Sequence, residues 1–173
     1  MGTHADFWQV TGEALDFALA ATGIDNPDLR TRLMALYREL DTFTEVTDTL
    51  TRLKAAGMKT AILSNGSPDM LNAAAAASGI DALLDAVLSV EDVGIYKPDP
   101  RVYQLAVDRL DVAAGNICFM SSNGWDAAGA GAFGFRVVWV NRYGQPVEHL
   151  PAKPDVILDT LTPLPAILGL ASA

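Results

Sequence analysis

The sequence has little cysteine, little histidine and few basic residues. Of its 173 residues, one is cysteine and two are histidine, and 12 lysines and arginines stand against 21 aspartates and glutamates, a formal net charge of −9. One cysteine forms no intrachain disulfide, and Cys118 lies in the apolar run NICFM, so we expect a buried, reduced thiol of a cytoplasmic protein. Because nucleic acids and anionic membranes are bound through positive surface, the acidic balance argues against both as partners.

The sequence also lacks a long apolar run. No stretch approaches the roughly 20 continuous apolar residues that a membrane-spanning helix needs. Half of the residues are nevertheless hydrophobic, which is enough for one well-filled core. The composition therefore predicts a soluble globular protein with one domain, or with one domain and a small appendage.

Two helices are predicted before the first strand. Residues 7–22 have apolar positions at helical spacing, and Gly23 ends the pattern. Asn26-Pro27-Asp28 then provides a capping side chain, a proline for the first turn and an acid near the positive helix end. A second helix should therefore run to about Leu40.

Helices and strands alternate through the rest of the chain. The patterns predict helices at 47–57, 69–78, 101–110 and 125–134, strands within 58–67, 84–90, 116–122 and 136–142, and a last strand and helix within 155–170. This alternation is typical of a parallel sheet covered by helices on both faces. We expect an α/β fold with one such sheet.

Polar residues follow three of these strands, where the ligand site of a parallel sheet is expected. They read SNGS at 64–67, YKP at 96–98 and SSNGWD at 121–126.

In this order and spacing, the three segments AILSNGS, YKPDPRVY and SSNGWDAAGA resemble motifs of the haloacid dehalogenase superfamily, and specifically of its type II (L-2-haloacid) dehalogenases. The resemblance runs from about Phe7 onward. It implies a Rossmann-like α/β core at 45–173 and a partial helical cap at 1–44. It further implies removal of halide from short 2-haloacids through an aspartyl ester, without metal or organic cofactor, in a homodimer.

The first motif of the superfamily, an aspartate nucleophile in a D-x-x-G-T setting after an apolar strand, has no match. Asp6 begins a segment with similar letters, but helical periodicity runs through it, and a helix start is the better interpretation. We expect the chain to begin within the cap and to lack both the nucleophile strand and a cap arginine.

The resemblance assigns catalytic support to five residues. Lys97 would keep the nucleophile ionised, and Asp126 would position or activate the hydrolytic water. Ser121 and Asn123 would orient these two, and Tyr103 would lend its hydroxyl. Three of them have an ordinary alternative: Lys97 as a solvated lysine, Asp126 as a carboxylate at a helix start, and Tyr103 as a half-buried core tyrosine.

Four more residues are assigned to the substrate. Ser64 and nearby amides would hold the substrate carboxylate, Asn65 would receive the halide, and Trp125 and Phe7 would wall the pocket. A plain turn and core packing are the alternatives. Trp8 and Trp139 are assigned to packing, and His4 and His149, which show no partner pattern, are given no role.

Two other functions stay open. Magnesium-dependent phosphatases of the superfamily carry a second acid four residues before the position of Asp126, where this chain has Ser122. A neutral hydroxyl is a poor substitute for an anionic Mg²⁺ ligand, which favours dehalogenation. The second alternative is an inactive fragment of the same fold.

Overall fold

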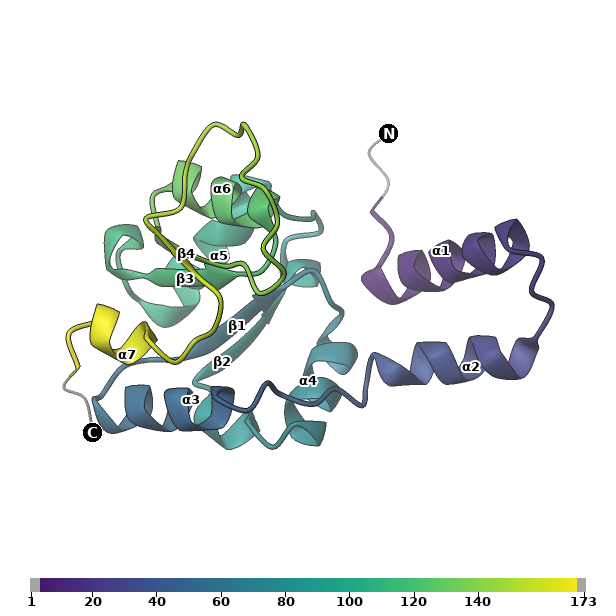
Figure 1. Ribbon diagram of the computed structural model, residues 1–173, viewed down its shortest axis with the longest axis horizontal. Helices are drawn as coiled ribbons and strands as arrows, with labels where there is room; N and C mark the ends of the chain where they lie inside the picture. Colours follow the sequence, from purple (N-terminus) through teal and green to yellow (C-terminus); the bar gives the residue numbers. More distant parts are fainter. Residues whose placement is uncertain (1–3, 171–173) are drawn as a thin grey trace.

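The computed structural model describes residues 4–170 and contains two groups of parallel strands with helices around them (Figure 1). β1 (Ala61–Ser64) pairs with β2 (Ala86–Ser89), and β4 (Arg136–Val140) lies between β3 (Cys118–Ser121) and β5 (Val156–Leu158). All pairs are parallel, which confirms the predicted α/β class. Among the described residues, no helix is long and apolar enough to cross a membrane.

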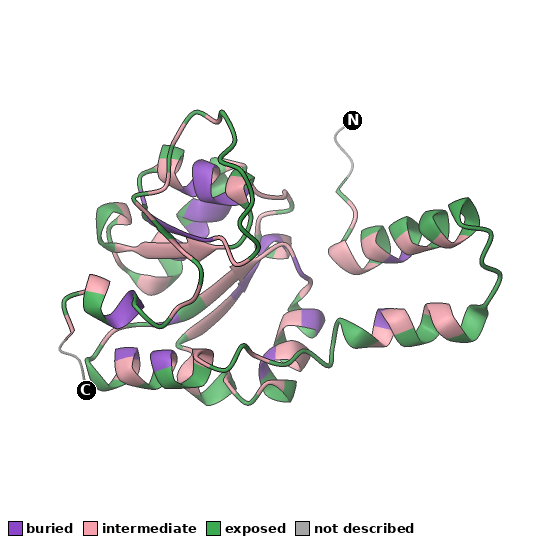
Figure 2. Cartoon of the chain, viewed as in Figure 1, coloured by how far each residue is buried: buried purple, intermediate pink, exposed green. Residues whose placement is uncertain are grey.

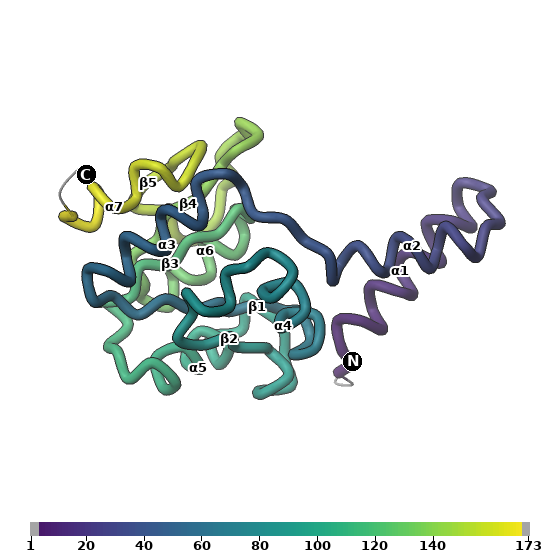
Figure 3. The backbone as a smooth tube through the Cα atoms, turned by 90° about the horizontal axis from the view of Figure 1, so that it is seen from below, coloured from purple at the N-terminus to yellow at the C-terminus, as the bar shows by residue number. Residues whose placement is uncertain are grey.

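The strands form two sheets, so the expectation of one sheet is wrong. The order across the molecule is β4, β3, β1, β2 in two perpendicular views, but no ladder joins β1 to β3 (Figures 1 and 3). Periodicity along the chain identifies strands, whereas edge pairing depends on how close two separate segments come.

The helices of the core follow the predicted segments. They are α3 (Val46–Ala55), α4 (Pro68–Ala77), α5 (Pro100–Leu110), α6 (Gly124–Phe133) and the short α7 (Leu164–Ile167), with 3-10 turns at Asp81–Leu83, Val90–Asp92 and Ala114–Asn116. α6 packs on β3 and β4, and α3 packs on α7.

Many of the buried residues, which are purple in Figure 2, belong to two hydrophobic clusters, and both clusters include residues of β4. One cluster centres on Tyr103 and Val137, and the other joins Leu53 to Val138 and Leu164. Trp139 is only 4% exposed, which confirms its assignment to packing. Cys118 carries a free thiol but is half-buried, not fully buried as expected.

The first two helices form a hairpin beside the core (Figure 1). Asp6 is the N-cap of α1 (Phe7–Ala21), and its carboxylate accepts a hydrogen bond from Gln9 N, as the helix-start interpretation predicts. α2 (Pro27–Leu36) ends before Leu40, because the next amides bond three residues back and tighten the chain into turns. The boundary between cap and core near residue 44 stays a prediction, and residues 1–3 and 171–173 of those ranges lie outside the described residues.

Glu45 connects the start of α3 to the C-terminal part of the core through hydrogen bonds. Its carboxylate accepts from Arg142 Nη2 at 2.6 Å and from Leu161 N at 3.2 Å, with the Glu45 side chain 16% exposed. Burial raises the pKa of Glu45, but the backbone amides and Arg142 outweigh it, so the pKa is lowered overall.

We expect Glu45→Gln to lower the free energy of unfolding by about 1 to 3 kcal/mol at pH 7, since it removes charge from two partly buried hydrogen bonds. A lowered carboxyl pKa stabilises the fold above the ordinary glutamate value and loses that effect as the pH falls through the folded value. The difference between variant and wild type in urea unfolding should therefore shrink below about pH 4. Exposed Glu39→Gln is the control, and equal losses in both variants would contradict the role of Glu45.

Candidate active site

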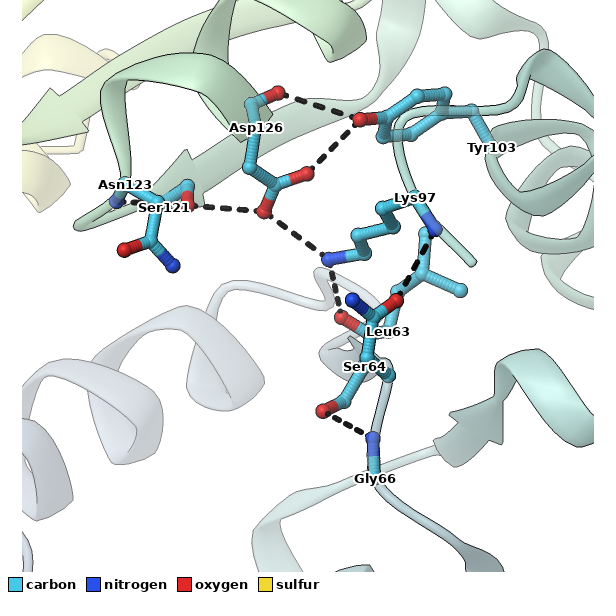
Figure 4. A network of polar contacts seen from close by, with 9 residues as sticks. Leu63, Ser64, Gly66, Lys97, Tyr103, Ser121, Asn123 and Asp126 are labelled. Atoms are coloured by element: carbon cyan, nitrogen blue, oxygen red, sulfur yellow. Dashed lines mark hydrogen bonds and ion pairs between the residues drawn. The ribbon is translucent and has the colours of Figure 1, made fainter. Parts of the chain in front are cut away.

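A buried ion pair lies where β1 and β3 end (Figure 4). Lys97 Nζ donates to the main-chain oxygen of Leu63 in β1 at 2.7 Å and lies 3.1 Å from Asp126 Oδ2 in the first turn of α6. Both charged side chains are only 6% exposed. One ammonium group thus bridges the exits of two strands that do not pair with each other.

The Asp126 carboxylate is held from both sides. Ser121 Oγ donates to Oδ2 and the Tyr103 hydroxyl donates to Oδ1, each at 2.9 Å. Tyr103 is fully buried and contacts the rings of Phe119, Phe133 and Phe135. With Lys97 as its third partner, the carboxylate is fixed in orientation, which suits a group that positions a water molecule.

Burial sets the protonation of this network. Burial lowers the pKa of Lys97, although the nearby Asp126 charge partly offsets this by raising it. Burial also raises the pKa of Tyr103. The phenol therefore stays a hydrogen-bond donor at neutral pH. The Lys97 ammonium also lies 4.8 Å from the centre of the Phe119 ring.

Small residues in α6 allow this close approach. A Cβ atom on Gly129 would lie 2.6 Å from the Tyr103 hydroxyl and 2.7 Å from Pro98 Cβ. The glycine therefore leaves the space in which Tyr103 reaches Asp126.

The turn after β1 is fixed by side chains of its own. Ser64 Oγ accepts from Gly66 N at 3.1 Å, and Ser89 Oγ donates to Gly66 O at 2.7 Å. Asn65 Oδ1 accepts from Lys97 N at 3.1 Å, which leaves the amide nitrogen of Asn65 on the opposite side. Ser64 thus makes the bond of an ordinary turn, while Asn65 reaches the lysine loop.

A cavity of about 490 Å³ opens beside the lysine. It brings together the predicted residues Phe7, Asn65, Lys97 and Trp125, and its remaining lining residues are Val10, Tyr96 and Pro98. Trp125 is 40% exposed. The lining is apolar apart from the lysine, the amide and the phenol.

The structure separates the other predicted residues into two groups. Tyr103, Ser121 and Asp126 form the network behind Lys97, whereas Ser64 and Asn123 do not line the cavity. Asn123 is exposed and donates only its backbone N–H, to Ser121 Oγ at 3.2 Å.

Sequence reasoning missed several contributors. The Leu63 carbonyl carries no signal in a side-chain pattern, and Tyr96 lies in the YKP motif, which assigns it no role of its own. His4, for which the sequence shows no partner pattern, does have a partner in the structure, because His4 Nε2 lies 2.8 Å from Glu91 Oε2. That partner follows β2, 87 residues away, so no local spacing could indicate it.

The structure also places Ser122, the position where the sequence comparison with phosphatases expects a second acid. Ser122 is exposed, and its main-chain oxygen accepts from Trp139 Nε1 at 3.2 Å. Within residues 4–170, no cluster of three or more histidine, cysteine, aspartate or glutamate side chains could hold a metal ion.

Known proteins share this sequence and fold. The family model of haloacid dehalogenase-like hydrolases matches residues 6–134. The chain is 51% identical over 169 residues to (S)-2-haloacid dehalogenase 1 of Pseudomonas sp. (strain CBS-3), covering 97% of this chain and 74% of the relative. It is also 51% identical to (S)-2-haloacid dehalogenase 4A of Burkholderia cepacia, covering 95% and 73%.

A solved structure of a dehalogenase has a similar fold. L-2-haloacid dehalogenase from Xanthobacter autotrophicus, with chloropropionic acid covalently bound, superposes with a TM-score of 0.87 at 33% identity, covering 98% of this chain and 78% of that one. Sequence and fold thus give the same answer as the strand-exit motifs. The chain belongs to the haloacid dehalogenase-like hydrolases.

Proposed function

We propose that this protein is an (S)-2-haloacid dehalogenase that hydrolyses short 2-haloalkanoic acids through an aspartyl ester. The observation that carries the proposal is the buried Lys97–Asp126 pair beside a cavity with apolar walls. A 2-haloacid matches both features, since it has one negative charge and an apolar carbon with its halogen. The Pseudomonas and Burkholderia relatives bear the same activity in their names.

The reaction has two steps with balanced charge. A carboxylate oxygen attacks C2 of the substrate, the carbon–halogen bond breaks, and halide leaves with the bonding electrons. Water then attacks the carbonyl carbon of the ester, which releases the 2-hydroxyacid and regenerates the carboxylate. The one proton that this hydrolysis releases passes to solvent.

Each site residue has a role in this scheme. Lys97 keeps the nucleophile ionised and balances charge, and Asp126, oriented by Tyr103 and Ser121, positions the water of the second step. Asn123 supports Ser121 through its backbone. Asn65 offers its amide nitrogen to the departing halide, while Phe7 and Trp125 enclose C2 and its substituent. Ser64 is assigned to the substrate carboxylate, with its turn amides.

We further propose that the nucleophilic aspartate lies upstream of Met1, on a strand that inserts between β1 and β3. Two facts support this location. The neighbouring edges of β1 and β3 share no ladder, and Lys97 Nζ spans their exits within 3.1 Å of a carbonyl on one side and a carboxylate on the other. A strand there would pair both edges and end beside the ammonium.

The proposal predicts halide release from (S)-2-chloropropionate, measured with a chloride electrode, by a version extended in frame upstream of Met1. The rate should be unchanged by EDTA, and replacing the upstream aspartate with asparagine should abolish it. The same preparation should not hydrolyse p-nitrophenyl phosphate with added Mg²⁺. Phosphate release that EDTA abolishes would instead favour the phosphatase alternative.

An assay of the 173-residue chain by itself distinguishes the inactive-fragment alternative from an active enzyme. If this chain alone is inactive while the extended version releases halide, the chain is an inactive fragment of an active fold. If neither version releases halide, the proposed function is wrong.

A homodimer and a cytoplasmic location complete the proposal. The hairpin of α1 and α2 exposes several apolar side chains, among them Phe17 at 77% and Leu36 at 54%, and burial of that face would favour association. The reduced state of Cys118 suits a cytoplasmic protein.

A further inference from the structure

One wall of the cavity belongs to a helix that the core touches sparingly. Phe7 and Val10 lie in the first turn of α1, whereas the other lining residues come from the core. The α1–α2 hairpin stands beside the core in both views and joins it through the segment after α2 (Figures 1 and 3). The width of the cavity therefore depends on what holds the start of α1 in place.

Two side-chain contacts hold that start. His4 Nε2 lies 2.8 Å from Glu91 Oε2, and the Tyr96 hydroxyl donates to Ala5 O at 2.5 Å. Aromatic contacts add to them, because the Tyr96 ring lies 5.1 Å from the ring of His4 and 6.2 Å, edge to face, from the ring of Phe7. Tyr96 thus touches residues 4, 5 and 7 in succession.

Glu91 is tied to the active-site turn on its other side. Its backbone N–H donates to Ser89 Oγ at 3.1 Å, and Ser89 Oγ donates to Gly66 O, next to Asn65. The second carboxylate oxygen, Oε1, is buried and finds no hydrogen-bond partner in the part of the chain that the structure describes. Within the described residues, His4 thus supplies the side-chain contact to the Glu91 carboxylate, at Oε2.

We propose that His4, Glu91 and Tyr96 form a clamp that positions the first turn of α1 and thereby sets the width of the substrate cavity. The three are positioning residues: they act through Phe7 and Val10. The consequence for the C2 substituent rests on the proposed function, whereas the positioning itself does not.

Hydrogen exchange tests the positioning directly, by mass spectrometry of peptides that cover residues 8–12. His4→Ala and Tyr96→Phe should each raise exchange there by about tenfold, since each removes a hydrogen bond that anchors the helix start. Exchange in β3 and β4 should stay unchanged and serves as the internal reference for global unfolding.

Two further variants distinguish the clamp from a general loss of stability. His4→Gln retains an N–H donor for Glu91 and should restore most of the protection that His4→Ala loses. His149→Ala removes an exposed histidine of the loop after β4 and should leave exchange at wild-type level. Unchanged exchange in both His4→Ala and Tyr96→Phe would overturn the proposal, as would an equal rise in His149→Ala.

Kinetics of the extended version test the consequence. His4→Ala should raise KM for 2-chloropropionate more than it lowers kcat, and should reduce the preference for 2-chloropropionate over the longer 2-chlorohexanoate by several-fold. An unchanged preference together with raised exchange would overturn the link between clamp and cavity width. Absence of halide release from every variant and from wild type would refute the proposed function, while the exchange result still decides the clamp.

Discussion

Replacing Lys97 with methionine is expected to lower the free energy of unfolding by about 3 to 5 kcal/mol, because it leaves the buried Asp126 carboxylate without its cation. Methionine retains the length and most of the volume of the side chain, so the loss reports charge rather than a cavity. Asp126→Asn should cost a similar amount for the opposite reason, since it leaves a buried ammonium facing a neutral amide. Urea unfolding followed by circular dichroism measures both.

The double variant Lys97→Met, Asp126→Asn gives the decisive comparison. With both charges removed, the amide oxygen still accepts from one of the two hydroxyls of Tyr103 and Ser121, and the amide nitrogen donates to the oxygen of the other, so the combined loss should be smaller than the sum of the two single losses. Lys153→Met, on an exposed lysine, should stay within about 0.5 kcal/mol of wild type. Strictly additive losses at Lys97 and Asp126 would mean that the two groups do not interact in solution.

The same variants should abolish halide release by the extended version. Lys97→Met removes the charge that keeps the nucleophile ionised, and Asp126→Asn removes the carboxylate that positions water. Because stability and activity then fall together, activity is compared at a temperature where each variant is folded.

Gly129→Ala should be strongly damaging for a change of one methyl group. The added Cβ would lie 2.6 Å from the Tyr103 hydroxyl and 2.7 Å from Pro98 Cβ, closer than real Cβ atoms approach. Either Tyr103 moves away from Asp126 or the loop that carries Lys97 shifts. We expect a loss of about 1 to 3 kcal/mol in the free energy of unfolding, typical of an overpacked core, and a large loss of halide release.

Gly115→Ala is the matched control. An added Cβ there meets no atom within 4 Å, and Gly115 is not among the glycines with positive φ. This variant should be neutral or slightly stabilising, since alanine has less conformational freedom in the unfolded chain. If both glycine variants behaved alike, the packing of Tyr103 against α6 would not explain the effect.

The sequence alone was informative about local structure and about the residues that leave each strand. Helix starts at Asp6 and Asn26, proline in a first turn and the alternation of apolar runs indicated the order of helices and strands. These signals depend on neighbours within a few residues, so they can be read along the chain. The motifs after the strands then named three residues of the cavity and three of the network around Lys97, and the resemblance added Phe7 of the cap to the cavity.

The tertiary structure decided every feature that joins distant segments. It split the strands into two sheets, gave Lys97 the Leu63 carbonyl as a second partner, and brought His4 to Glu91 across 87 positions. It also showed Ser64 bonded within its own turn and Asn123 acting through its backbone. Main-chain acceptors and long-range partners leave no periodic trace in a sequence, because they arise only when packing brings separate elements together.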